Sequence, residues 1–233
     1  MRWIMGGSIV SLLLVTGVIH LSGCATPSPD TGHPTPAPTS GEIALPAPRL
    51  TGETSLEEAI AGRRSAREFT DEPLARQDVS QLLWAAQGIT DPRGLRAAPS
   101  AGALYPLEIY VVLAEGAYHY LPQRHAIQLL SESDLRGDLW NAGLRQDALR
   151  QAPTIFVIAA VYEGTEAKYG ERAERYVELE AGHAAQNLLL QAVALELGAV
   201  PIGAFYDEQV RAALGLPGDY RPLYLIPVGH PQQ

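Results

Sequence analysis

Residues 63–67 read RRSAR, which places three arginines and a serine within five positions. Guanidinium groups donate hydrogen bonds in a fixed fork that fits the oxygens of a phosphate. Because the stretch follows a predicted helix, two interpretations stay open. The set Arg63, Arg64, Ser65 and Arg67 could hold a phosphate, or its arginines could complement the negative end of the helix dipole.

The dipeptide Lys168-Tyr169 is the second candidate for chemistry. Sixteen of the seventeen Lys and Arg residues are arginine, and Lys168 is the one lysine. A lysine that is removed from water can release its proton near neutral pH, whereas arginine keeps its charge. A lysine beside a phenol could therefore handle protons. The alternative is an ordinary exposed lysine.

Other chemistries find little support in the sequence. The six histidines include no pair with HxH or HxxxH spacing, and Cys24 is the single cysteine, so no metal site is predicted. The motifs GxSxG and GxxxxGKS are missing, and GAVPIGAF lacks the glycine pattern of a dinucleotide-binding turn. The formal net charge of −9 disfavours nucleic acid as a partner.

The candidate residues must be positioned by helices and strands, which the hydrophobic periodicity predicts from residue 54 onward. A capping box at Thr54 or Ser55 begins a helix that ends at Gly62, with Leu56, Ala59 and Ile60 as its apolar face. Further helices are predicted at 76–87, 133–142, 171–197 and 207–214, and strands at 107–114, 117–121, 126–130, 154–162, 199–205 and 222–228. The apolar run 154–162 should be a central strand that is covered on both faces. Strands interleaved with helices predict an α+β fold, in which helices pack on one mixed sheet.

The first 24 residues are predicted to be an export signal. Residues 8–19 form an apolar run that is too short to span a bilayer, and residues 21–24 (LSGC) look like a bacterial lipobox, in which Cys24 is diacylated and becomes the mature N-terminus. The alternative is an uncleaved anchor. The Pro-rich residues 25–50 predict a tether, which leaves residues 51–233 as the folded domain. We therefore expect a protein of the cell envelope that is lipid-anchored at Cys24 on the extracytoplasmic side, and at the outer membrane if the organism has one.

Four stretches share a register with a known family: RRSAREF (63–69), APSAGALYPLEIYVV (98–112), KYGERAERYVELEAGHAAQNLLL (168–190) and GAVPIGAF (198–205). Together they resemble the FMN-dependent nitroreductase family over residues 54–230. They are most similar to its branch of SagB-type azoline dehydrogenases, which oxidise thiazolines and oxazolines in peptides to azoles. The resemblance implies a nitroreductase-like sandwich, an interlocked homodimer and FMN as the cofactor.

The resemblance also implies which residues bind the cofactor. Arg63 and Ser65 fall where the family holds the FMN phosphate and ribityl chain, Arg67 falls near the flavin N1/O2 edge, and Arg64 is grouped with them. Two further stretches match cofactor-binding loops of the family. The first contacts the flavin of the partner subunit and corresponds to Pro99, Ser100, Ala101 and Gly102. The second faces flavin N5 and O4 and corresponds to Ile202, Gly203 and Ala204. Ala103 and Tyr105 stand where plain nitroreductases carry Asn and Gln, which favours the azoline branch.

The implied reaction is hydride transfer to flavin N5 from an azoline-like or other small organic substrate, which is a small molecule or a peptide. Lys168 would be the base, and Tyr169 would position the substrate or donate a proton. Two alternatives stay open, an NAD(P)H-dependent nitro or quinone reductase and a binding lipoprotein that keeps the fold without turnover. Export separates the protein from cytosolic nicotinamide, which disfavours the reductase. A lipid anchor is the one membrane contact expected.

Overall fold

Strand β5 (Thr154–Val161) lies in the interior of the sheet, as its unbroken apolar run predicts. Seven of its eight residues are buried. It pairs with β2 (Leu107–Leu113) on one side and with β7 (Tyr220–Gly229) on the other. The expectation of a central strand with both faces covered is therefore confirmed.

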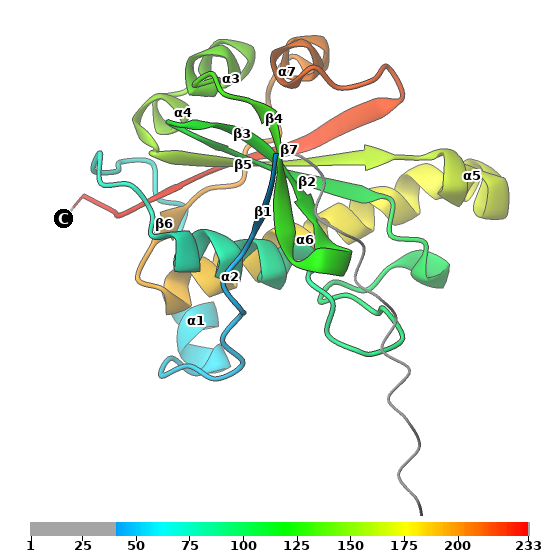
Figure 1. Cartoon of the computed structure of the whole chain (residues 1–233), viewed down its shortest axis with the longest axis horizontal. Coiled ribbons are helices and arrows are strands. Elements are labelled where there is room, and N and C mark those ends of the chain that lie inside the picture. Colours follow the sequence, from blue (N-terminus) through cyan, green and yellow to red (C-terminus); the bar gives the residue numbers. More distant parts are fainter. Residues whose placement is uncertain (1–40, 233) are drawn as a thin grey trace, which may run out of the picture. The chain divides into compact units, whose positions relative to one another are not determined.

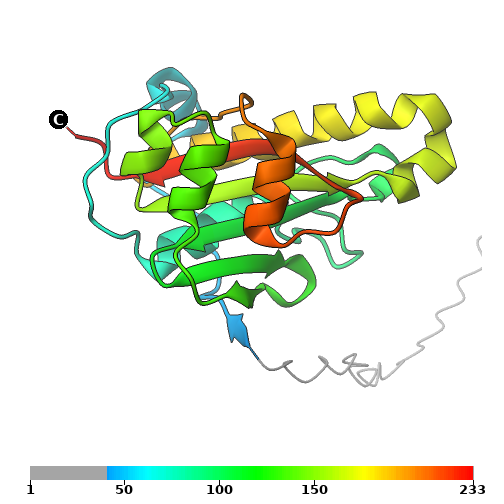
Figure 2. The ribbon, with the colours of Figure 1, turned by 90° about the horizontal axis from the view of Figure 1, so that it is seen from above.

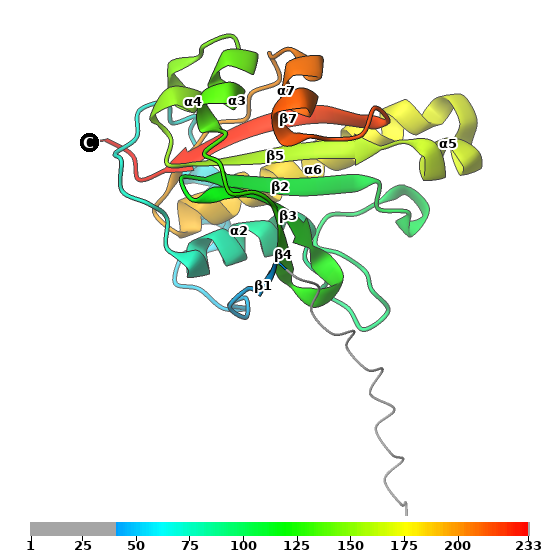
Figure 3. The same cartoon turned by 45° about the horizontal axis from the view of Figure 1, so that its top comes forward.

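The structure, a computed structural model, describes residues 41–232. Its strand order is β1-β4-β3-β2-β5-β7-β6 (Figure 3). The other strands are β1 (Glu42–Ala44), β3 (Gly116–Leu121), β4 (Ala126–Ser131) and β6 (Gly198–Ala199). All pairs of neighbouring strands are antiparallel, and parallel pairing within residues 41–232 is confined to a bridge between Ser65 and Ala199. The predicted mixed sheet is thus an antiparallel one, because the short connections from β2 through β4 allow no parallel crossover.

Helices cover both faces of this sheet (Figures 1 and 2). One face carries α2 (Arg76–Gln87) and the long α6 (Ala173–Ala194), with α1 (Leu56–Gly62) against α6. The opposite face carries α3 (Arg136–Ala142), α4 (Asp147–Gln151) and α7 (Asp207–Leu214). Two separate apolar cores result, one on each side of the sheet.

Most predicted elements are present, and the differences have local causes. Helices α2 and α7 have the predicted bounds, and α1 begins with a complete capping box between Ser55 and Glu58. The predicted apolar face of α1 is wrong, since Leu56 and Ile60 are 61% and 56% exposed in this chain. The predicted helix 133–142 is α3, followed by the unpredicted α4.

The region around the long helix is also more broken than the sequence predicts. The predicted helix 171–197 is α6, preceded by a separate α5 (Glu163–Tyr169) and a single turn at Gly170–Arg172. The predicted strand 199–205 is reduced to β6 and a bridge between Ile202 and Leu225. Gly170 has a positive φ of 55°, which glycine tolerates and which ends α5.

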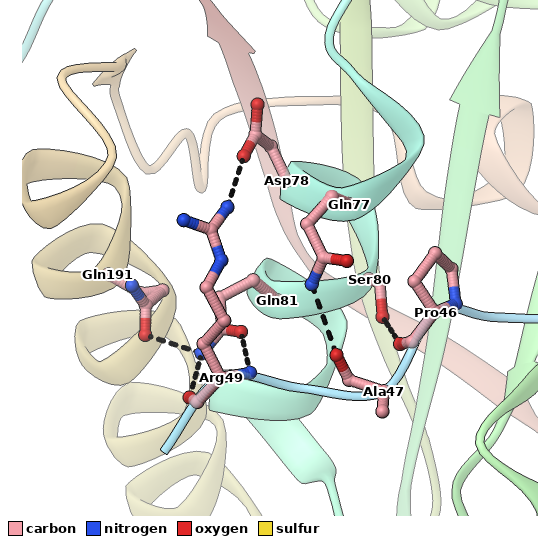
Figure 4. Close-up of polar contacts among 8 residues, drawn as sticks. All are labelled: Pro46, Ala47, Arg49, Gln77, Asp78, Ser80, Gln81 and Gln191. Carbon is pink, nitrogen blue, oxygen red and sulfur yellow. Dashed lines mark hydrogen bonds and ion pairs between the residues drawn. The ribbon is translucent and has the colours of Figure 1, made fainter. Parts of the chain in front are cut away.

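Residues 41–50 belong to the fold, although the sequence assigned them to the tether. Strand β1 pairs with β4, and Leu45 is 8% exposed. The following residues are fixed to α2 (Figure 4): Gln81 exchanges hydrogen bonds with the Arg49 backbone, with N–H to Oε1 at 2.7 Å, and the Ser80 hydroxyl donates to Pro46 O at 2.6 Å. Prolines do not prevent this, because an edge segment can bond through its carbonyls.

The predicted signal, Cys24 and the tether up to residue 40 lie outside the described residues. Within residues 41–232, no helix combines the length and the apolar character that crossing a membrane requires.

Candidate functional site

The RRSAR stretch lies beside the GAVPIGAF stretch, although the two are far apart in the sequence. The Ala66 N–H donates to Ala199 O at 3.1 Å, next to the bridge between Ser65 and Ala199. The contact is tight, because a Cβ on Gly198 would lie 2.6 Å from the Ala66 Cβ. Sheet pairing therefore brings two of the four predicted stretches together.

The arginines of this stretch have different surroundings. The Arg64 guanidinium donates to the carbonyls of Ala61 and Arg63 at 2.9 and 2.8 Å, so it caps the carboxyl end of α1. These bonds fit the helix-cap interpretation for Arg64. Because its guanidinium is engaged with the backbone, Arg64 is less suited than Arg63 and Arg67 to bind a ligand. Arg63 and Arg67 have no carboxylate partner among residues 41–232, and Arg67 makes one long bond of 3.4 Å to Ser65 O. These two cations are available to an anion.

The strand-end loop beside them is fixed by hydrogen bonds at Ile202 and, through its carbonyl, at Ala204, which accepts from Gln146 Nε2 at 3.0 Å. Ile202 is buried and exchanges both backbone hydrogen bonds with Leu225, at 2.8 and 2.9 Å. Gly203 and Ala204 are exposed, and nothing lies within 4 Å of a Cβ built on Gly203. We call Arg63, Ser65, Arg67, Gly203 and Ala204 the arginine site.

The other two stretches meet at a second place, which we call the lysine site (Gly102, Lys168 and Tyr169). Gly102 has a φ of 62°, and a Cβ built on it would lie 2.5 Å from Lys168 Nζ and 2.6 Å from the Tyr169 hydroxyl. A side chain at this position would therefore require the tips of Lys168 and Tyr169 to move. The Tyr169 ring meets the edge of Tyr176 on α6 at a centroid distance of 5.1 Å.

The loop that carries Gly102 is strained and held by specific bonds. Ala103 and Tyr105 have positive φ values of 54° and 51°, which non-glycine residues adopt at an energetic cost. The Tyr105 N–H donates to the Ser100 hydroxyl at 2.9 Å, and the Arg96 N–H donates to the Tyr105 hydroxyl at 3.1 Å. Pro99 and Ala101 make no side-chain contact of this kind, so Ser100 and Gly102 are the members of the predicted set that the loop geometry singles out.

A buried carboxyl group, Glu180, lies beneath this loop and was not predicted. Its side chain accepts a hydrogen bond from Gln87 Nε2 at 3.3 Å. Burial raises the pKa of Glu180 to about 7, against the lowering effects of Ser100, Gln87 and Arg96. The sequence did hold a signal, because Glu180 continues the buried stripe of Ala173, Val177 and Ala184 on α6.

The arginine site and the lysine site lie at opposite ends of α6 (Figure 1). Gly62, one residue before the RRSAR stretch, faces Val193 near the end of the helix, whereas Tyr169 contacts Tyr176 near its start. A helix of 22 residues is about 33 Å long. One chain therefore assembles the four stretches as two separate pairs and not as one pocket.

Neither site is enclosed within a single chain. Lys168 is exposed, so this chain alone does not provide the removal from water that the base hypothesis requires. A cavity of about 770 Å³ lies elsewhere, at the strand ends beneath residues 68–76, and none of the predicted site residues lines it.

The chain matches the nitroreductase family over residues 60–230. A nitroreductase-like protein of Methanocaldococcus jannaschii is 45% identical over 183 residues, which are 76% of this chain and 91% of that protein. The crystal structure of a nitroreductase-like protein from Ralstonia eutropha is 30% identical, with a TM-score of 0.75 over 83% of this chain and 90% of that one. A chain of the Escherichia coli microcin synthetase complex shares the fold, with a TM-score of 0.66 and 24% identity over 73% of this chain and 70% of that one.

The family match spans most of the described residues, and a relative with 45% identity covers three quarters of the chain. Together with the antiparallel sheet covered by helices on both faces, these similarities show that the chain belongs to the nitroreductase family of oxidoreductases.

Proposed function

We propose that this protein binds FMN and oxidises a small organic or peptide substrate of the azoline type, as SagB-type dehydrogenases do. The observation that carries the proposal is the contact of Gly102 with Lys168 Nζ and the Tyr169 hydroxyl. Three residues from two distant stretches converge there, and the small glycine leaves space for the amine and the phenol. This convergence supports the proposal.

The arginine site fits the anionic parts of FMN. Arg63 and Arg67 are cations without carboxylate partners among the described residues, and Ser65 offers an exposed hydroxyl beside them. Guanidinium is well suited to bind phosphate in a bidentate manner. Open space at Gly203 would allow a flat ring to approach the backbone. When bound, FMN would supply the hydride acceptor.

A homodimer would join the arginine site of one chain to the lysine site of the other. Because the two sites lie at opposite ends of α6, antiparallel packing of two α6 helices around a twofold axis brings one site of each kind together at both ends. Exposed apolar side chains are available for such an interface: Leu56 and Ile60 on α1, Leu104 beside Gly102, and Leu179 on α6. The second chain would also shield Lys168 from water.

In this arrangement, Lys168 accepts a proton from the substrate ring while a hydride leaves the neighbouring ring position. Loss of a proton and a hydride together removes two electrons and forms a ring double bond, which converts an azoline to an azole. Tyr169 orients the substrate with its hydroxyl, and its ring is fixed by Tyr176. The electrons then pass to an acceptor such as oxygen or a quinone.

The proposal is tested by anaerobic mixing of the FMN-loaded protein with a thiazoline-containing peptide, followed by flavin bleaching. Lys168→Ala and Lys168→Arg should both slow flavin reduction by roughly 10²- to 10⁴-fold, because guanidinium keeps its charge but does not accept the proton. FMN affinity should change little, because Arg63 and Arg67 would hold the phosphate and Lys168 would lie at the substrate instead. Wild-type rates in Lys168→Arg would reject the proton-transfer role, and bleaching by NAD(P)H but not by the peptide would identify the alternative reductase.

We also propose that the protein acts in the cell envelope, anchored by a lipid on Cys24. The support is the sequence LSGC at residues 21–24, which lies outside the described residues. Cys24→Ser should release the protein from the membrane fraction or block its processing. A serine variant that remains membrane-bound at the processed size would exclude this anchor.

A further inference from the structure

The segment that places Gly102 at the lysine site has an unusual backbone. Gly102, Ala103 and Tyr105 have positive φ values of 62°, 54° and 51°. Glycine adopts such values freely, whereas residues with a Cβ adopt them at an energetic cost. Strain of this kind persists where surrounding contacts over-determine the conformation, and it is frequent at functional sites. The contacts that hold Ala103 and Tyr105 therefore decide where Gly102 lies.

Tyr105 closes this segment into a loop, because its side chain contacts Arg96 in two ways. The Arg96 N–H donates to the Tyr105 hydroxyl at 3.1 Å, and the Arg96 guanidinium carbon lies 4.7 Å from the centre of the Tyr105 ring. A guanidinium at this distance over a ring is attracted to the ring face. The two ends of residues 96–105 are thereby tied to each other, and we call these residues the Tyr105 loop.

The base of the Tyr105 loop is fixed to the two long helices on one face of the sheet. Arg96 Nη1 donates to Gln87 Oε1 on α2 at 3.3 Å, and Gln87 is fully buried. The next residue accepts through its carbonyl, with Asn187 Nδ2 on α6 at 3.3 Å from Ala97 O. Because Arg96 is held in place by these bonds, it provides a fixed point to which Tyr105 is attached.

Inside the loop, Ser100 connects Tyr105 to the tip that carries Gly102. The Ser100 hydroxyl accepts from the Tyr105 N–H at 2.9 Å, and the Ser100 carbonyl accepts from the Ala103 N–H at 3.1 Å. Both strained residues with side chains are therefore bonded to Ser100. Gly102 lies between them and faces Lys168, whose Nζ and Cε are 2.5 and 3.3 Å from a Cβ built on the glycine.

We propose that Tyr105 is a positioning residue, whose phenol holds the Tyr105 loop so that Gly102 lies against the other two members of the lysine site. The inference rests on the proposed function, because it explains how the two residues that handle protons there are placed. Tyr105 does not touch the substrate in this role. It acts through Arg96 and through the backbone of the loop.

The two contacts of the phenol can be removed one at a time. Tyr105→Phe removes the hydroxyl that accepts from Arg96 and keeps a ring under the guanidinium, whereas Tyr105→Leu removes both contacts. Tyr118→Phe is the matched control, because it also deletes a phenol hydroxyl. Tyr118 is buried on β3, and its hydroxyl makes no hydrogen bond to another described residue.

NMR of the full chain in the presence of FMN measures the placement of the loop directly. Lys168 is the one lysine of the sequence, so isotope-labelled lysine gives a single side-chain Cε signal. In the wild type, the Cε protons should show a nuclear Overhauser contact with the α-protons of Gly102. Tyr105→Phe should shift the Cε signal and weaken this contact, Tyr105→Leu should abolish it, and Tyr118→Phe should change neither. A signal and a contact that stay at their wild-type values in Tyr105→Leu would overturn the proposal.

Flavin reduction by a thiazoline-containing peptide shows whether Tyr105 acts through the lysine site. Tyr105→Phe should slow it by about tenfold and Tyr105→Leu by about 10²-fold, because small displacements of a reacting group are costly. In a Lys168→Ala background, Tyr105→Phe should cause no further loss, since the group that it positions is already gone. A further tenfold loss there would show that Tyr105 acts by another route and would contradict the positioning role.

The NMR measurements need no turnover, so the two proposals can fail separately. A protein that does not oxidise the thiazoline-containing peptide would fail the test of the proposed function. Its Lys168 signal would still decide whether Tyr105 holds the loop.

Discussion

At the scale of single residues, a side chain at Gly102 should disturb the lysine site. Its φ of 62° adds about 1 kcal/mol of strain to an alanine, and the new Cβ would displace the Lys168 amine and the Tyr169 hydroxyl. Gly102→Ala should therefore slow flavin reduction by about 10²-fold, as displacements of about 1 Å do. Gly215→Ala is the matched control, because Gly215 has a φ of 63° with nothing within 4 Å of its Cβ. Equal rates in the two variants would show that the contact has no role.

Also at this scale, Glu180 should make stability depend on pH. Its pKa is raised by burial from 4.5 to about 7 in the folded chain, so folding favours the protonated form. The resulting stabilisation is fully present below about pH 4.5 and is lost as pH rises through about 7, by on the order of 3 kcal/mol. Urea unfolding at several pH values should show that the unfolding free energy of the wild type falls over this interval relative to that of Glu180→Gln. Parallel curves would exclude a titrating Glu180.

At the scale of elements, the segment 41–50 should contribute to stability although it is rich in proline. Without it, Leu45 leaves the core, and the buried Ser80 and Gln81 lose their hydrogen bonds to Pro46 and Arg49. A chain that begins at residue 51 should be less stable by about 3–6 kcal/mol than one that begins at residue 41, which lowers the melting temperature by about 10 °C. Calorimetry of the two chains measures this difference. Equal melting temperatures would show that the segment does not stabilise the fold and behaves as part of the tether.

At the scale of the whole molecule, the proposed twofold arrangement predicts that dimerisation and FMN binding are lost together. Leu179 is 51% exposed on α6, and a charge buried at that interface would lack a partner. Leu179→Arg should give monomers by light scattering at micromolar concentration and weaken FMN binding by roughly 10²-fold or more. Leu144→Arg, at an exposed leucine after α3 on the other face of the sheet, should remain dimeric and flavin-bound. A wild-type monomer that keeps its flavin would remove the basis of the shared site.

The sequence by itself determined those features that depend on nearby residues. Periodicity and caps predicted α2 and α7 with their observed bounds, and the apolar run 154–162 predicted the central strand. The same local information identified RRSAR, the single lysine beside Tyr169 and the glycine-containing loop. It misjudged β1, because a strand of three residues has little propensity of its own and exists through its pairing with β4.

Only the tertiary structure decided which of these features meet. Sheet pairing brings the arginine stretch to Ala199. The turn of the chain between α5 and α6 places Tyr169 against Tyr176 and near Gly102. It also separated the two pairs by the length of α6 and buried Glu180 under the loop. These contacts bring Gly102 to Lys168 and Tyr169, which are 66 and 67 positions away, and Ser65 to Ala199, which is 134 positions away. Their energies depend on strand order and burial, which no local pattern of residues encodes.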